Sequence, residues 1–136
     1  MLRNIGAVVL GLIVGMAVNM ALIMVSWALF PMPDGMDMNV PAEMNAYVAT
    51  LPVTAFFIII AAHLGQSFVG GWVAARVGAS HPVVLAMIIG VLALMGGVAN
   101  MMMIEHPPWM YVEVPLYLVV AFAAGKLVER SRVEHA

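Results

Sequence analysis

The second half of one long apolar segment has the sequence HLGQSFVGGWVAAR and runs from His63 to Arg76. Its polar and small residues recur at intervals of three and four positions, so they share one face of a helix. They are His63, Gln66, Ser67, Gly70 and Ala74. Because the other apolar segments carry comparable small or polar stripes, we predict that this face is a seam where the helices of a bundle pack.

The composition of the chain predicts an integral membrane protein. Hydrophobic residues make up 65% of the 136 residues and charged residues 9%, whereas about 25% of a typical soluble domain is charged. There is no cysteine, which excludes a disulfide framework and a CxxC redox site. The polar segments are too short for a soluble domain or a nucleic-acid surface. We therefore expect residues 1–136 to form a single transmembrane domain whose surroundings are the lipid bilayer.

Four apolar stretches are long enough to cross the hydrocarbon core of a bilayer, which takes about 20 helical residues. They cover approximately residues 5–30, 53–77, 83–104 and 109–128. A signal peptide is the alternative for the first stretch, but its apolar run is too long and lacks a convincing cleavage site. The sequence thus predicts an all-α, polytopic membrane protein built as a four-transmembrane-helix bundle.

The one long connection, residues 31–52, is predicted to contain a short helix. Pro41 is placed to begin this helix, which reaches to about Thr50. One side of it would carry the apolar residues Met44, Tyr47, Val48 and Leu51. Such a helix either lies in the membrane interface or packs as a lid over the bundle, and the sequence leaves both alternatives open.

The distribution of basic residues predicts the orientation in the membrane. All lysines and arginines flank the span ends on one side: Arg3, Arg76, Lys126, Arg130 and Arg132. The two connections on the other side contain acidic residues and no basic ones. By the positive-inside rule, both termini are expected to be cytoplasmic.

Small residues form stripes that favour close packing between helices. In the first span Ala7, Gly11, Gly15 and Asn19 fall at every fourth position, a spacing that lets helix backbones approach closely in lipid. The predicted helix-packing residues across the spans are Gly11, Gly15, Gly70, Ala74, Gly90 and Gly97.

Polar residues within the spans are the candidates for a functional site. Counted at about 1.5 Å per helical residue, Asn19, His63 and Gln66 lie near the midplane, whereas Asn100 and Glu113 lie about one turn below the outer surface. Tyr117 is placed to connect these two levels. Together with Ser67, these residues form either an interhelical network that holds the bundle together or a functional polar track.

No motif in the chain indicates catalysis or a bound cofactor. The sequence contains no nucleophile–base pair, phosphate-binding loop or His/Asp/Glu cluster at metal-ligand spacing. We therefore expect no enzyme activity, no cofactor and no metal site. Methionines at positions 16, 20, 24 and 101–103 keep copper binding open as an alternative, since thioethers bind Cu(I), although methionine is also a common filler of apolar interfaces.

Several short motifs resemble a known family. They are HLG at 63–65, GGWVAAR at 70–76, Asn100 followed by HPPW at 106–109, and GKL at 125–127. The pattern is similar to that of a family of small four-helix bacterial membrane proteins described only as uncharacterised. This resemblance implies a four-helix fold in a bacterial inner membrane, and it implies no activity and no site residues.

Two functions remain as hypotheses. The first is a structural or accessory membrane protein that acts through helix–helix packing, either as a homo-oligomer or within a larger membrane complex. It rests on the small-residue stripes and the absence of soluble mass. The second is a small oligomeric transporter or channel that uses the intramembrane polar track.

Overall fold

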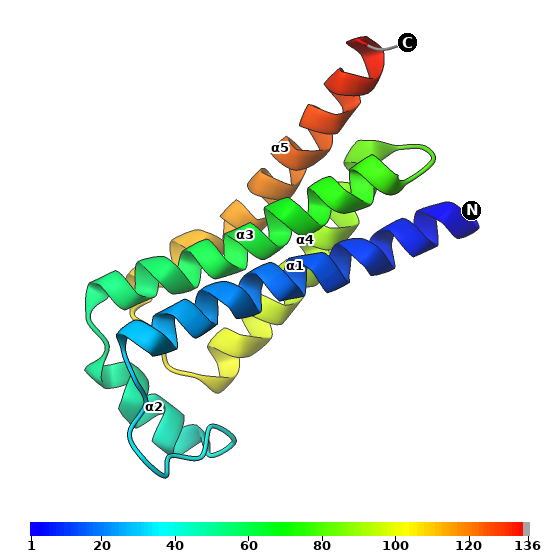
Figure 1. Cartoon of the computed structure of the whole chain (residues 1–136). Helices are drawn as coiled ribbons and strands as arrows, with labels where there is room; N and C mark the ends of the chain where they lie inside the picture. The colour runs from blue at the N-terminus through cyan, green and yellow to red at the C-terminus, as the bar shows by residue number, and fades with distance from the viewer. Residues whose placement is uncertain (135–136) are drawn as a thin grey trace.

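The computed structural model describes residues 1–134, in which four long helices run side by side and a short helix lies across one end (Figure 1). The elements are α1 Leu2–Leu29, α2 Pro41–Thr50, α3 Val53–Val77, α4 Pro82–Met103, the 3₁₀ helix η1 Pro108–Val112 and α5 Glu113–Glu134. Both termini and the α3–α4 turn lie at one end, here called the termini end. The α2 end lies opposite.

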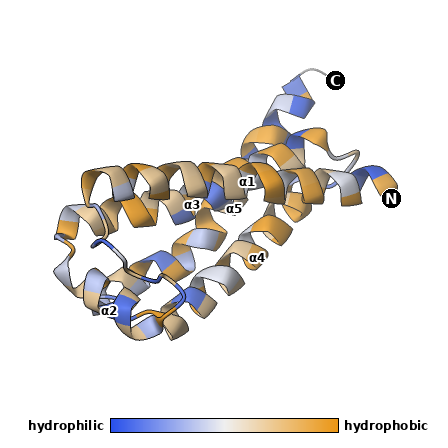
Figure 2. Cartoon of the chain, turned by 60° about the horizontal axis from the view of Figure 1, so that its bottom comes forward, coloured by the Kyte–Doolittle hydropathy of each residue, from blue (hydrophilic) through white to orange (hydrophobic). Residues whose placement is uncertain are grey.

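The four long helices are apolar and long enough to cross a bilayer, so the chain is a multi-pass α-helical membrane protein. Figure 2 shows hydrophobic residues along these helices and hydrophilic ones around α2 and near the C-terminal end. The all-α prediction is confirmed. The last helix continues beyond the predicted end at residue 128, as far as Glu134. Its charged final turns keep helical geometry, with an ion pair between Lys126 and Glu129 three positions apart.

The backbones of α1 and α3 meet at glycines. A Cβ atom added at Gly11 would lie 2.6 Å from the carbonyl oxygen of Gly70, and one added at Gly15 would lie 2.7 Å from that of Gln66. Ala74 is fully buried beside them. The predicted small residues of these two helices thus face each other, and there is no room for a side chain at either glycine.

The seam between α4 and α5 also depends on glycine. A Cβ atom at Gly90 would lie 2.5 Å from the Cβ of Ala121. The sequence analysis did not select Gly125. A Cβ atom added at Gly125 would lie 2.7 Å from the Cα of Val83. The stripe of α4 therefore packs on α5, whereas that of α1 packs on α3.

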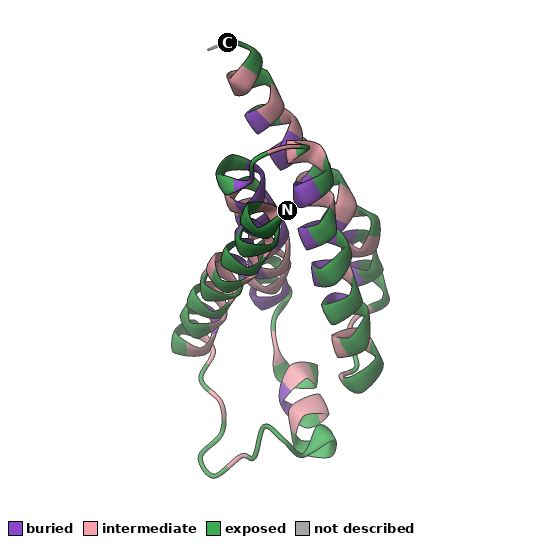
Figure 3. Ribbon diagram, turned by 90° about the vertical axis from the view of Figure 1, so that its right-hand side faces the viewer, coloured by how far each residue is buried: buried purple, intermediate pink, exposed green. Residues whose placement is uncertain are grey.

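Helix α1 is the least enclosed of the four. The helices α3, α4 and α5 all pack on one another, whereas α1 packs mainly on α3 and hardly contacts α4. Most of α1 is exposed (Figure 3). Its methionines Met16, Met20 and Met24 lie on this exposed face, away from the interior of the bundle.

Two arginines close the termini end by capping α3. The Nε of Arg3 donates to the carbonyl oxygen of Val77 at 2.9 Å. The Nη2 of Arg132 donates to the carbonyl oxygens of Ala75 and Gly78, each at 2.7 Å. The last carbonyls of a helix have no intrahelical partner, and basic side chains there satisfy them and oppose the helix dipole. These contacts join α1, α3 and α5.

Helix α2 is held across the α2 end by two hydrogen bonds. The hydroxyl of Tyr47 donates to the carbonyl oxygen of Phe30 at 2.6 Å, and the side-chain oxygen of Asn45 accepts from the backbone N–H of Glu105 at 3.0 Å. The apolar residues predicted for one side of α2 line a hollow shared with α1, α3 and α4. Apart from these contacts α2 packs little on the long helices and is mostly exposed, so both alternatives for this helix stay open.

Candidate functional site

The centre of the candidate site is a contact between an imidazole on α3 and a carboxyl on α5, which is an ion pair when the imidazole is protonated. His63 lies in the middle of α3 and Glu113 is the first residue of α5, 50 positions away. The Nδ1 atom of His63 lies 3.1 Å from Oε1 and 3.2 Å from Oε2 of Glu113. The side chain of Glu113 is completely buried, and that of His63 is 15% exposed. A carboxyl group is thus enclosed within the bundle with one imidazole as its partner.

The contact joins residues that the sequence analysis placed at different depths. That estimate counted 1.5 Å per residue along the whole fourth span. The span instead begins with η1, and the steeper rise of a 3₁₀ helix, about 2.0 Å per residue, adds only about 2 Å of depth. The larger part of the difference comes from the level at which the span begins. Trp109 of η1 packs against Phe56 and Phe57, with ring centroids 6.0 and 5.7 Å apart. This contact anchors η1 on the first turn of α3 and brings Glu113 level with His63.

Tyr117 lies one turn below Glu113 and supports the pair. Its hydroxyl donates to Oε1 of Glu113 at 3.4 Å, and its ring stacks on that of His63. Ser67 donates to the backbone carbonyl of Tyr117 at 2.8 Å. A Cβ atom at Gly97 would overlap the phenol ring, so the glycine makes room for the tyrosine. Among the described residues, every buried side-chain nitrogen or oxygen has a hydrogen-bond partner.

A recess leads from the α2 end to His63. Its deeper part has a volume of about 220 Å³ and lies between α1 and α4, with polar lining residues Asn19, His63, Gln66, Asn100 and Tyr117. Its outer part, about 230 Å³, lies beneath α2 and shares Asn19, His63 and Asn100 with the deeper part. At about 30 Å³ per water molecule, each part has room for about seven waters or one small solute.

The predicted polar residues therefore divide into two groups. Asn19, Gln66 and Asn100 line the recess together with His63 and Tyr117. Glu113 and Ser67 lie behind this lining and are fully buried. The predicted two levels are joined directly by the ion pair, with Tyr117 as a second link.

The outer part of the recess contains functional candidates that the sequence analysis missed. Trp27, Tyr47 and His106 line it beside the predicted residues. The Nδ1 of His106 lies 2.7 Å from the carbonyl oxygen of Ile104. His106 directly precedes two prolines, and the sequence analysis noted it only as part of the HPPW motif at 106–109. Its approach to the recess depends on how the α4–η1 connection folds back.

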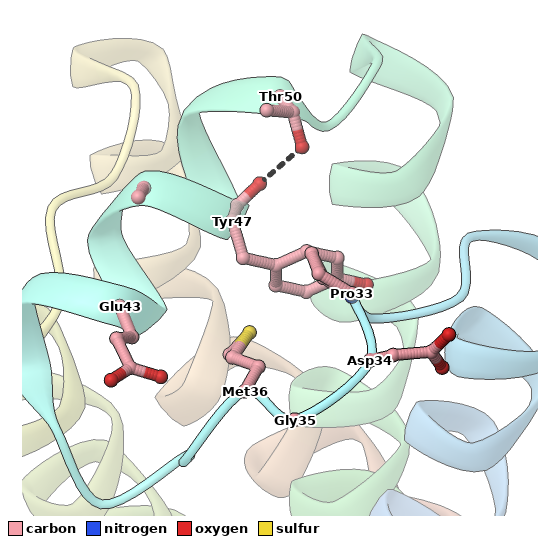
Figure 4. Close-up of a pocket in the computed structure, with 8 residues that line it drawn as sticks. Pro33, Asp34, Gly35, Met36, Glu43, Tyr47 and Thr50 are labelled. Atoms are coloured by element: carbon pink, nitrogen blue, oxygen red, sulfur yellow. Dashed lines mark hydrogen bonds between the residues drawn. The ribbon is translucent and has the colours of Figure 1, made fainter.

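A separate hollow lies between α2 and the loop that precedes it (Figure 4). It has a volume of about 410 Å³ and is lined by the loop 33–36 together with Glu43, Ala46, Tyr47 and Thr50. It is wide and mostly apolar. Its acidic residues are exposed, and Glu43 accepts a hydrogen bond from the backbone N–H of Asp37. The ring of Tyr47 lies between this hollow and the recess. We assign the candidate site to the recess because the recess, unlike this hollow, reaches His63 of the buried pair.

Within residues 1–134, no group of three or more His, Cys, Asp or Glu side chains is arranged to hold a metal ion. The methionine stripe of α1 faces outward, as described above. Any copper-binding arrangement on this stripe would therefore lie on the exterior of the bundle, separate from the recess.

Fold and site together define a class: a small multi-pass α-helical membrane protein with an ionisable pair buried at the end of a recess. Comparisons with protein-family models, with curated proteins and with solved structures found no match. Function is therefore inferred from the geometry of the recess and of the pair.

The hydrogen bond from the hydroxyl of Tyr47 to the carbonyl oxygen of Phe30 leads to a testable prediction. Burial raises the pKa of the Tyr47 phenol, so the hydroxyl stays protonated at neutral pH and donates to Phe30. Tyr47→Phe removes a bond that contributes about 1 kcal/mol, so amide hydrogen exchange in α2 is expected to become about fivefold faster. The control is Tyr111→Phe, because Tyr111 is exposed and its hydroxyl makes no hydrogen bond among the described residues. Equal rates of amide exchange in α2 in both variants would mean that the Tyr47 hydroxyl does not stabilise α2.

Proposed function

We propose that the protein is a small membrane transport protein that admits a small solute from the α2 end to the His63–Glu113 pair. The observation that carries this proposal is an ionisable pair, with Glu113 fully buried, at the deep end of a recess that runs from the α2 end. Ionisable side chains inside a membrane are energetically costly and mark functional sites by default. A pair that served only for packing would be replaceable by apolar side chains with little or no loss of stability.

Transport also requires that the termini end open, and the helix contacts support such a movement. Beyond the recess, α1 and α3 meet at Gly11, Gly15 and Gly70, which present no side chains that interlock. Small sliding movements of packed helices are a common form of conformational change. The arginine caps at Val77 and Gly78 hold this end closed in the present state. In this proposal, the present conformation is the state that is open toward the α2 end.

The orientation and the assembly form part of the same proposal. The basic residues at the termini end favour a cytoplasmic location for both termini, so the recess would open to the outside. The resemblance described above supports a bacterial inner membrane. Helix α1 hardly contacts α4, which leaves the deeper part of the recess open on that side. We propose that a second copy of the chain covers it in a homo-oligomer.

A second candidate is an accessory subunit of a larger membrane complex. It is favoured by the exposed face of α1, which packs on one helix only. In this case the His63–Glu113 pair is a structural link between α3 and α5. Neither candidate includes a catalytic step.

Solvent access to the recess tests the proposal directly. Because the chain lacks cysteine, single-cysteine variants can be labelled in proteoliposomes with a charged maleimide that does not cross the membrane. We expect Asn100→Cys to react from the α2 side. The controls are Met20→Cys, on the exposed face of α1, and Ala121→Cys, fully buried, and both should stay unmodified. An unreactive Asn100→Cys variant would contradict an open recess.

Stability and transport measurements then separate the two candidates. Under the transport proposal, Glu113→Gln folds and assembles as the wild type does, yet loses solute uptake into proteoliposomes. Under the accessory alternative, no uptake is found for the wild type, and Glu113→Gln weakens the bundle or its assembly; loss of stability in a His63 variant is expected under both candidates. Native mass spectrometry after gentle extraction adds an independent readout, since a hetero-complex favours the accessory role.

A further inference from the structure

We infer that the solute is a small organic monocation and that it competes with one proton at the His63–Glu113 pair. This inference rests on the proposed transport function and names the chemistry of its site. Three features of the structure support it: the charges around the recess, the side chains of its walls, and the charge balance of the buried pair.

The charges around the recess favour a cation. All lysines and arginines of the chain lie at the termini end, and none lines the recess. The loops at the α2 end carry four acidic residues: Asp34, Asp37, Glu43 and Glu105. Asn39 donates two hydrogen bonds to Asp37, which lower the pKa of that carboxyl, so it is ionised at neutral pH. A surface with one sign of charge raises the local concentration of ions of the opposite sign.

The walls of the recess suit an organic cation better than a metal ion. Trp27 and Tyr47 line its outer part together with Met44 and several aliphatic side chains. Aromatic faces attract cations electrostatically, and quaternary ammonium groups are recognised in this way. Metal cations such as Ca²⁺ instead need several oxygen ligands. As noted above, the described residues contain no cluster of carboxylates and imidazoles that would supply them.

The buried pair can balance one positive charge. Glu113 carries one negative charge when ionised, and one proton shared with His63 makes the pair neutral. His63 lies between the recess and Glu113, so a cation that displaces the protonated imidazole takes its place beside the carboxylate. The displaced proton leaves through the recess to bulk water. With both the cation and the proton bound, a net charge would remain in a low-dielectric site, which is costly. Cation and proton therefore exclude each other.

Few other titratable groups face this pair. Tyr117 of α5 contacts Glu113 directly, and His106 of the α4–η1 connection lines the outer recess. Helix α4 contains no titratable residue, and the only one in α1 is Arg3 at the termini end. The exchangeable proton is thus assigned to His63 and Glu113, with His106 on the route to water.

Choline and its uncharged carbon isostere, 3,3-dimethylbutan-1-ol, provide a matched pair of probes. Binding to the full chain in lipid nanodiscs is measured by calorimetry in two buffers of different protonation enthalpy, which gives the number of protons released. We expect choline to bind with release of about one proton, and its affinity to rise about tenfold per pH unit while the pair is protonated. The isostere should bind at least tenfold more weakly and release no proton.

Two variants test whether choline binding and proton release take place at the His63–Glu113 pair. Glu113→Gln keeps the shape of the side chain but removes its charge, so choline binding and the accompanying proton release should both be lost. Glu129→Gln is the matched control, since Glu129 lies at the termini end and pairs with Lys126. This control should bind choline as the wild type does.

The possible failures are distinguishable. Equal binding of choline and the isostere, or no choline binding by a protein whose Asn100→Cys variant is reactive, would show that the recess exists but does not select cations. Choline binding without proton release would overturn the competition. An unreactive Asn100→Cys variant together with absent binding of both probes would overturn the transport proposal itself.

Discussion

Replacing His63 alone by leucine is expected to lower the free energy of unfolding by about 3–5 kcal/mol at neutral pH, the cost typical of breaking a buried ion pair. The reason is the complete burial of Glu113. Without the imidazole 3.1 Å away, the only remaining side-chain partner of the carboxyl is the hydroxyl of Tyr117, at 3.4 Å. This hydroxyl carries no charge to balance the carboxylate.

The double variant His63→Leu/Glu113→Leu is expected to recover most of this loss. Removing both charges also removes their desolvation cost, and apolar pairs often replace buried ion pairs without loss of stability. Reversible unfolding in mixed micelles, carried out on both single variants and the double variant, gives the coupling energy of the pair. A cost below about 1 kcal/mol for His63→Leu would be the value of an exposed ion pair, and it would contradict a buried pair in which both groups are charged.

The same double variant bears on function. If the pair serves only for packing, the double variant should retain every activity and assembly of the wild type. If it is the solute site, the double variant should be stable and inactive. The double variant is expected to be stable under both roles, so its activity separates a packing role of the pair from a solute-binding role.

The second large effect is expected at the seam between α1 and α3. A Cβ atom at Gly70 would lie 2.7 Å from the carbonyl oxygen of Gly11 and 3.1 Å from a methyl group of Ile89. The first contact is with backbone, which a side-chain rotation cannot relieve, so the two helices must move apart. Gly70→Ala should therefore cost about 1–3 kcal/mol, the range typical of overpacking.

The control for this prediction is Gly96→Ala. A Cβ atom at Gly96 has no neighbour within 4 Å, and alanine favours a helix over glycine by about 1 kcal/mol in propensity. This variant should be as stable as the wild type or slightly more so. Equal stability of Gly70→Ala and Gly96→Ala in the same unfolding assay would mean that α1 does not approach α3 as closely as the structure places it.

Much of the architecture follows from local composition and periodicity. A hydrocarbon core requires about 20 apolar helical residues per span, and four stretches satisfy this length, so their number and approximate limits are readable directly. The spacing of Gly11, Gly15 and Gly70 likewise places small residues on one face of each helix. Both inferences need only the period of a helix and the thickness of a bilayer, and neither needs the position of a neighbouring helix.

The site depends on contacts between residues far apart in the sequence, which no local sequence pattern reveals. His63 and Glu113 are 50 positions apart, and their contact arises mainly because Trp109 anchors η1 against Phe56 and Phe57, about one turn into α3. The position of α2 across the end of the bundle depends in the same way on the path of the connection between α1 and α3. The position of His106 at the recess depends on the path of the connection between α4 and η1. Depth along a span can be counted from sequence, whereas the rotation of each helix about its own axis is set by packing against its neighbours, and this rotation brings the carboxyl to the imidazole.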